Sequence, residues 1–443
     1  MKQILLATAL LATSAFAPAA MAHDETHDSH EGFTLIHAGT VLVDADDAPL
    51  RRQTIIVHEG KIVGVEPGYI DDDEATIIDL KDHFVMPGMI DSHVHLRGEW
   101  SPSQRLDNVT KEPEDYALDA AHNAMKTLEA GFTAVQDVGG PPAIFALKRA
   151  IDSGKVPGPH IRAAGSAISV TGGHGDADGY RTDLLHIMAS ETVCNGVADC
   201  RKAVRTAVKR DADVIKITAT GGVLSNTNAG TGLQFFEDEL EAIMQTAAKM
   251  GRKVTAHAHG KDGIEAAVRA GVNSIEHGTY LDARTAKLMA DNDVVLVPTV
   301  LAGATVVDWA TNFDFLPPNS AKKALEVGPQ MQDMLGIAYR NGVTIAFGTD
   351  TGVSPHGSNA QEFAIMKAAG MSETDMLRAA TKVAAEHIEM ADAIGTLEAG
   401  KHADIIAVDG NPLRDITVLE DVDFVMKGGV VYKSEDSPTT PAP

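Results

Sequence analysis

The stretch "PGMIDSHVHLRGEW" (87–100) closes an apolar run with Asp91, Ser92 and two histidines one residue apart. Residues two apart on a β-strand point to the same side, so His93 and His95 can hold one metal ion from a single strand. Taken alone, the pair fits equally well with two polar residues at the mouth of a strand. Its meaning therefore depends on how the other strands of the chain end.

Seven further apolar segments follow, and most of them are separated by helix-period segments such as 235–251 and 263–271. The second of these ends on Gly271, as expected of a helix C-cap. Eight strands alternating with helices over about 300 residues predict an α/β fold, a (β/α)8 TIM barrel. A doubly wound open sheet is the alternative, although no G-x-G-x-x-G follows a strand. The predicted strands are 83–95, 132–139, 160–165, 213–222, 253–260, 274–279, 294–300 and 344–350.

Short alternating strands with turn signals occur at both ends of the chain, in 33–67 and 395–433. They predict one small β-sandwich domain built from residues 23–86 and 393–434, flanking a barrel over 87–392. The polar, proline-rich residues 435–443 are expected to be a disordered tail.

The first residues are typical of an export signal. Lys2 precedes an apolar run over 4–17, and Ala20–Ala22 form an A-x-A cleavage site, which predicts a signal peptide over 1–22. The run is too short for a spanning helix, which disfavours an uncleaved anchor. We expect a periplasmic or secreted protein with no membrane association in its mature form.

The net charge limits the classes of macromolecular partner, and the two cysteines indicate how they are used. The formal net charge of −25 disfavours nucleic acid and anionic membranes. In an oxidising compartment, Cys194 and Cys200 favour a small disulfide over a metal site, because two thiolates are too few for a closed zinc site.

Polar, metal-capable residues end most of the predicted strands. The carboxyl ends of barrel strands converge on one face, so these side chains are expected to meet His93 and His95 there. That convergence favours a metal site over isolated polar residues. Either histidine of the fifth strand can be a ligand; we favour the first and place the second beside the substrate. The candidates are His257, His259, His277, Asp350 and, within the fourth strand, Lys216.

Lys216 is unusual because apolar residues flank it on a predicted interior strand. Burying an ammonium is costly, so one interpretation is a lysine paired with a carboxylate. The other is a lysine of depressed pKa that reacts with carbon dioxide to give a carbamate, a carboxylate on a long stem that can bridge two metals.

The motifs "PGMIDSHVH", "VIKI", "AHAHG", "IEHGT", "FGTD" and "GTLEAGKHADIIAVDGNP", in this order, resemble the amidohydrolase superfamily in its imidazolonepropionase-like branch. The resemblance covers nearly the whole mature chain. It implies two zinc ions: one bound by His93, His95 and Asp350, the other by His257 and His277, with carboxylated Lys216 and a hydroxide as bridges. Imidazolonepropionase itself holds a single metal and lacks the strand-four lysine, so Lys216 argues against that activity.

Within this branch the chain is similar to metal-dependent carboxypeptidases, prolidase-like dipeptidases and amidohydrolases that degrade ochratoxin A. The closer likeness lies in 169–176, 221–230 and 348–357, expected in loops after strands three, four and eight. It implies cleavage of the amide of N-acyl amino acids or peptides with a free C-terminal carboxylate, including ochratoxin A to ochratoxin alpha and phenylalanine. Relatives form homo-oligomers, often octamers, which implies the same here.

Individual roles follow from this chemistry. Asp350 can accept a proton from the attacking hydroxide and pass it to the leaving nitrogen, or it can be a ligand alone. His174, His259 and Arg97 are candidates for binding the substrate carboxylate, with His174 as a plain loop residue being the alternative. Trp100 and Trp309 can wall an aromatic pocket or belong to the core.

The sequence leaves three candidate functions open. The first is hydrolysis of linear amides, with prolidase-like or Xaa-Lys/Arg dipeptidase activity as a variant. The second is hydrolysis of cyclic amides, which gives one product instead of two. The third is a non-catalytic binding protein, which a complete set of metal ligands with Asp350 disfavours.

Overall fold

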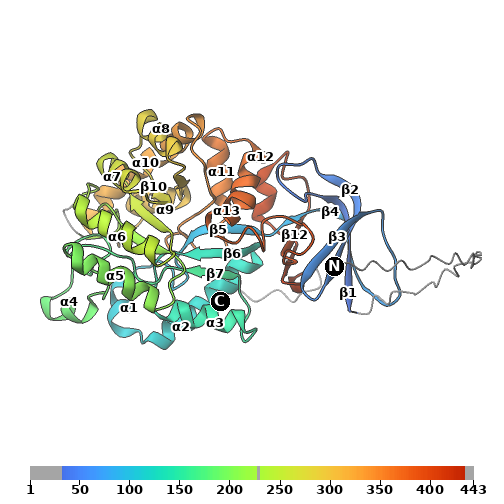
Figure 1. The fold of residues 1–443 in the computed structure, drawn as a ribbon, viewed down its shortest axis with the longest axis horizontal. Helices are drawn as coiled ribbons and strands as arrows, with labels where there is room; N and C mark the ends of the chain where they lie inside the picture. Colours follow the sequence, from blue (N-terminus) through green and yellow to red (C-terminus); the bar gives the residue numbers. More distant parts are fainter. Residues whose placement is uncertain (1–31, 227–229, 435–443) are drawn as a thin grey trace, which may run out of the picture.

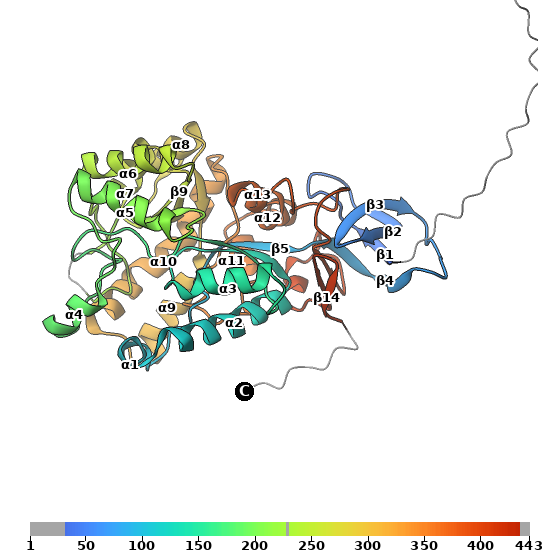
Figure 2. The same ribbon diagram turned by 60° about the horizontal axis from the view of Figure 1, so that its bottom comes forward.

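The computed structural model describes residues 32–226 and 230–434, which form a barrel with a small sheet domain at one end (Figures 1 and 2). The expected signal peptide (1–22) and tail (435–443) lie outside the described residues, as do three residues of the 221–230 loop. The predicted TIM barrel with a second, smaller β domain is confirmed.

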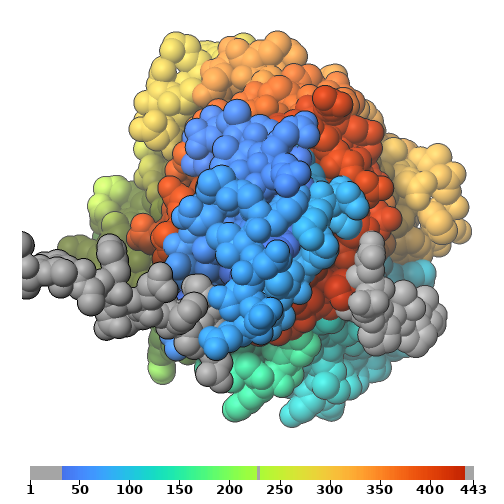
Figure 3. Space-filling model, turned by 90° about the vertical axis from the view of Figure 1, so that its right-hand side faces the viewer, coloured from blue at the N-terminus to red at the C-terminus, as the bar shows by residue number. Residues whose placement is uncertain are grey.

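The small domain joins both ends of the chain in one mostly antiparallel sheet, with strand order β14-β13-β12-β4-β1-β2-β3. Figure 3 shows the N-terminal strands beside C-terminal segments on this end of the molecule. A bridge between Lys61 and His402 connects β3 back to the segment before β12, so the sheet folds over on its own core. Its strands are β1 (Phe33–Val41), β2 (Leu50–His58), β3 (Lys61–Pro67), β4 (Thr76–Pro87), β12 (Ile405–Val408), β13 (Phe424–Lys427) and β14 (Val430–Lys433).

The first predicted strand is divided in two at Gly88. β4 ends in the small sheet at Pro87, and β5 begins in the barrel at Met89. The Gly88 amide donates to the Asp404 carbonyl of the small domain. A Cβ at this position would lie 2.2 Å from Thr133 Oγ1 of the next barrel strand, so only glycine fits this crossing between domains.

Eight parallel strands close the barrel. Seven are regular: β5 (Met89–Val94), β6 (Phe132–Asp137), β7 (His160–Ala163), β8 (Ile215–Thr218), β9 (Val254–Ala258), β10 (Ser274–His277) and β11 (Val295–Val297). The eighth, near 345–351, pairs through single parallel bridges, Leu296 with Ile345 and Val94 with Thr351. Ile168 and Ile217 join the β7 and β8 sides in the same way. All eight predicted barrel strands are therefore present.

Helices surround the strands of the barrel (Figure 1). Helix α7 ends at Gly271 in the left-handed conformation (φ 92°), as its sequence predicted. No helix in the described part of the chain is long and apolar enough to cross a bilayer. The helices are α1 (Gln104–Thr110), α2 (Pro113–Glu129), α3 (Ala143–Asp152), α4 (Thr182–Met188), α5 (Val197–Lys209), α6 (Glu237–Lys249), α7 (Lys261–Ala270), α8 (Ala283–Asp291), α9 (Val300–Asn312), α10 (Pro318–Arg340), α11 (Gln361–Ala368), α12 (Glu373–Ala380), α13 (Lys382–His387) and the 3-10 helix Ile416–Glu420.

A disulfide joins Cys194 and Cys200, with Cα atoms 4.9 Å apart. The Cys194 amide donates to the Ser169 carbonyl. The bridge therefore holds the segment before α5 against the start of the 169–176 loop.

Candidate metal centre

Two groups of metal-capable side chains lie at the carboxyl ends of the barrel strands. The first consists of His93, His95 and Asp350. Asp350 Oδ1 lies 3.5 Å from His93 Nε2 and 3.2 Å from His95 Nε2. Burial alone would raise the pKa of Asp350, but attraction to the two imidazoles outweighs it and lowers that pKa. The side chain is therefore a carboxylate that faces two ring nitrogens.

Asp91 explains why an acid precedes these histidines on β5. It is fully buried and accepts from the amides of His93 and Thr349, the Thr349 hydroxyl and the Asn359 side chain. Burial raises the pKa of Asp91 to about 6, while these donors lower it. Asp91 thus ties the first barrel strand to the end of the eighth, directly beside Asp350.

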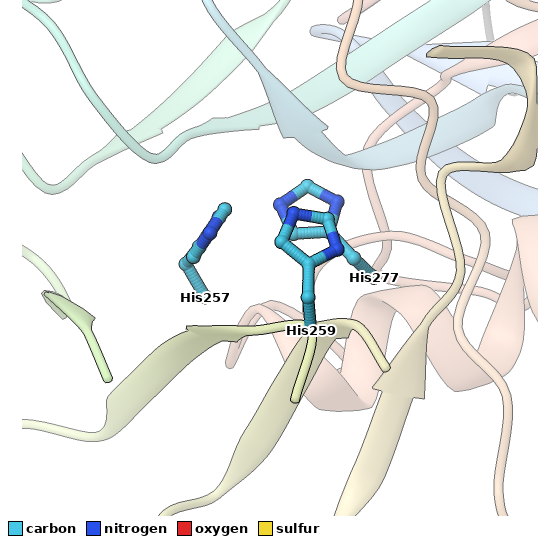
Figure 4. A group of neighbouring side chains, drawn as sticks. All are labelled: His257, His259 and His277. Carbon is cyan, nitrogen blue, oxygen red and sulfur yellow. The ribbon is translucent and has the colours of Figure 1, made fainter. Parts of the chain in front are cut away.

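The second group consists of His257, His259 and His277, whose rings point into one space above β9 and β10 (Figure 4). His259 stacks on His277 at 4.9 Å between ring centroids, and His257 meets both rings edge-on at 4.6 Å. His259 Nδ1 lies 2.8 Å from the Thr279 hydroxyl. All three can each offer one ligand atom, so the geometry leaves both His257 and His259 available.

Partners behind the histidines fix their orientation. His93 Nδ1 lies 2.7 Å from a Glu276 carboxylate oxygen, and His277 Nδ1 lies 2.7 Å from the Thr299 hydroxyl. His95 Nδ1 lies 2.8 Å from the Gly139 carbonyl. Such contacts select the tautomer with a free Nε2, the usual arrangement for metal-binding histidines.

Free buried atoms support a metal site here. Among the described residues, His93 Nε2, His257 Nε2 and Asp350 Oδ1 are buried and make no hydrogen bond of acceptable geometry. Buried polar atoms are normally satisfied, so three ligand atoms of this kind in one place fit a bound cation. Imidazole nitrogens with a carboxylate oxygen suit zinc and similar divalent ions.

Lys216 lies on β8, is 5% exposed and lines the same cavity as the two groups. Burial lowers the pKa of Lys216, opposed by attraction to Glu276 and Asp350. Within the described part of the chain, no carboxylate forms an ion pair with its ammonium. The interpretation in which a carboxylate pairs with Lys216 is therefore not supported. A lowered pKa is consistent with the other interpretation, carbamate formation.

Both groups open into a cavity of about 600 Å³. His174 lies against it with its ring stacked on His257 at 4.2 Å, and burial lowers its pKa to about 3. Arg97 and Trp100 line the cavity, and Arg97 donates to Asn108. Trp309 is not among the lining residues.

Of the two placements left open for Trp309, the structure therefore supports the core. Its ring contacts Phe315 edge-on at 5.4 Å and packs against the hydrophobic core. Helix α9 presents Ala302, Gly303 and Val306 to the cavity instead.

Sequence reasoning missed several residues around the site. Glu276 follows Ile275 on β10 and by simple alternation should face away from His277. His277 has a left-handed backbone (φ 70°), which allows both neighbours to contribute to the site. Arg105, stacked on Tyr180 at 4.6 Å, also lines the cavity and carried no motif.

Comparison with known proteins matches this architecture to one family. Residues 84–432 match the model of the amidohydrolase family. The chain is 32% identical to ochratoxinase of Aspergillus niger over 428 residues, which is 90% of this chain and 86% of that protein.

Solved structures agree. A crystal structure described as a Xaa-Pro dipeptidase with bound methionine in the active site is 40% identical, with a TM-score of 0.86, and covers 91% of this chain and 100% of its own. The crystal structure of Aspergillus niger ochratoxinase is 30% identical, with a TM-score of 0.79, over 91% of this chain and 96% of its own. The chain therefore belongs to the amidohydrolase family and is a hydrolase of amide or peptide bonds.

Proposed function

We propose that this protein is a binuclear zinc amidohydrolase that cleaves the amide bond of N-acyl amino acids or peptides with a free C-terminal carboxylate, with ochratoxin A as one substrate. The observation that carries the proposal is Asp350, whose Oδ1 faces two imidazoles across from the three-histidine group at the cavity floor. The relatives named ochratoxinase and Xaa-Pro dipeptidase support this substrate class.

The residues divide the binding of two ions between them. His93, His95 and Asp350 would hold one ion and His257 and His277 the other, with carboxylated Lys216 between them. Two divalent ions supply Lewis acidity and lower the pKa of a bound water to near neutrality.

Asp350 would carry out the proton transfer. Because its pKa is lowered, it is ionised at neutral pH and can accept the proton of the attacking water. It then returns this proton to the leaving nitrogen, which must depart as an amine. Glu276 and Thr299 hold the imidazoles of His93 and His277 in place throughout.

Substrate binding, assembly and location belong to the same proposal. His174 and His259 would donate hydrogen bonds to the substrate carboxylate, with Arg97 nearer the mouth of the cavity. The protein would act as a homo-oligomer in the periplasm or outside the cell after removal of residues 1–22.

A hydrolysis panel read by mass spectrometry tests the proposal. Zinc-loaded protein and Asp350→Ala receive ochratoxin A, other N-acyl phenylalanines, Xaa-Pro and Xaa-Lys dipeptides and a hydantoin. We expect phenylalanine from ochratoxin A with the wild type only. If the fully metal-loaded protein hydrolysed none of the linear amides, the proposal would be overturned. Hydrolysis of the hydantoin alone would reassign the protein to cyclic amides.

A further inference from the structure

Lys323 is a buried lysine that the chemistry above does not use. It lies on α10 and is 8% exposed. Its Nζ donates to the carbonyls of Gly222 and Ser225, at 2.6 and 2.7 Å. No acid of the described residues forms an ion pair with it, and both partners are neutral. Burial lowers the pKa of Lys323, opposed only by the more distant Asp178.

This cation lies directly behind the wall of the active-site cavity. Val327 and Met331, one and two turns further along α10, line the cavity, as do Val223, Leu224 and Ser225 of the loop that Lys323 holds. The loop also contacts His174: a Cβ on Gly222 would lie 2.2 Å from that imidazole. The ammonium of Lys323 is therefore bonded to the same loop that lines the cavity beside His174.

A buried charge without a counter-ion is unfavourable in the free protein. A substrate carboxylate beside His174 would supply the missing opposite charge, and the attraction is strong where water is excluded. A local positive charge matters particularly in this chain, because its net charge of −25 repels anionic substrates.

We propose that Lys323 is the positioning residue that makes the cavity selective for substrates with a free carboxylate, acting across the loop 222–225 beside His174. The inference rests on the proposed function in that the substrate is a carboxylate-bearing amide. It goes further by assigning the charge that recognises the carboxylate to a residue that does not touch the substrate.

The test compares an N-acyl phenylalanine with its C-terminal carboxamide, which is neutral and similar in shape. In Lys323→Gln, which keeps an amide donor for the loop, we expect KM for the free acid to rise about tenfold. KM for the carboxamide and kcat for both should stay within about twofold. Lys323→Arg should restore most of the preference for the acid. Lys322→Gln is the matched control, since it removes the same charge from an exposed neighbour (77% of its side chain).

Equal losses on acid and carboxamide in Lys323→Gln would overturn the inference, because they would show that the lysine only supports the loop. An unchanged preference in Lys323→Gln would also overturn it. If Arg105→Gln abolishes the preference in that case, the charge lies at the mouth of the cavity.

Binding measurements separate this inference from the proposed function. Calorimetry of L-phenylalanine and L-phenylalaninamide with the zinc-loaded protein needs no turnover. Tighter binding of the acid in the wild type and its loss in Lys323→Gln would support the subsite even if every amide of the panel remained intact. Equal binding of the two ligands to the wild type would overturn it. Should the glutamine variant fail to fold, Lys323→Met, which removes the charge and keeps a long side chain, carries the same comparison.

Discussion

Replacing Glu276 with glutamine should weaken metal binding although Glu276 is not itself a ligand. Its carboxylate accepts from His93 Nδ1 at 2.7 Å, from the Ser274 hydroxyl at 3.1 Å and from the Thr255 hydroxyl. This side chain is fully buried. An amide of the same shape can still accept from His93, but without the negative charge that makes the imidazole a stronger ligand.

The magnitude follows from that one bond. A hydrogen bond to a charged group contributes about 1.5–3 kcal/mol, and its neutral equivalent about half as much. The difference, roughly 1–1.5 kcal/mol, corresponds to about a tenfold loss of zinc affinity. Glu276→Ala removes all three hydrogen bonds. It should lower zinc affinity by close to a hundredfold, about the upper limit for residues that hydrogen-bond to metal ligands.

Zinc content measured by mass spectrometry, after dialysis against buffered free zinc, gives the affinity. Glu239→Gln is the matched control: Glu239 is also buried, but it accepts from the amides of Gly196 and Phe236 near the start of α6. This control should lose stability and keep its zinc. An affinity within threefold of wild type in Glu276→Gln, with stability reduced, would refute the reasoning and make Glu276 an ordinary core acid.

Three further outcomes are expected. Asp350→Asn should lower kcat by about 10²–10⁴-fold at equal metal content, measured on the substrate that the panel identifies; recovery of full kcat with excess zinc would contradict a proton role. Burial raises the pKa of Glu362 to about 8, so its stabilising contribution is complete below the unfolded value near 4.5 and is lost as pH rises through 8. The free energy of unfolding, measured from pH 5 to 9, should therefore fall for the wild type relative to Glu362→Gln, by at most roughly 5 kcal/mol, and parallel curves would contradict this. Reduction of the Cys194–Cys200 disulfide should lower the free energy of unfolding in urea by roughly 2 kcal/mol, with no effect of reductant on Cys194→Ala/Cys200→Ala.

Barrel strands could be predicted because each is a short apolar run that ends in a polar residue. The histidines of β9 and β10 were expected at one face for the same reason, and the structure brings them within reach of one another. The turn at Glu59 and Gly60, with φ of 48° and 75°, follows from a local dipeptide signal.

The residues that surround the metal ligands could not be predicted, because their partners are distant in sequence. Lys323 follows Lys322 in a helical pattern typical of a solvated face, and its acceptors lie about a hundred residues away. The sequence left the placement of Trp309 open because its helix is apolar on most sides, so the pattern did not show which side faces the cavity. The placement of side chains that depend on long-range contacts can be read only from the folded structure.

The tie between Asp91 and Thr349 also sets an order of events during biosynthesis. The two residues are 258 positions apart, and Asn359, which completes the tie, comes ten residues after Thr349. A chain still emerging from the ribosome has its first two histidines long before the aspartate that faces them. An ion held by His93, His95 and Asp350 would therefore find all three ligands only after the barrel has closed, which would make metal loading a late stage of maturation.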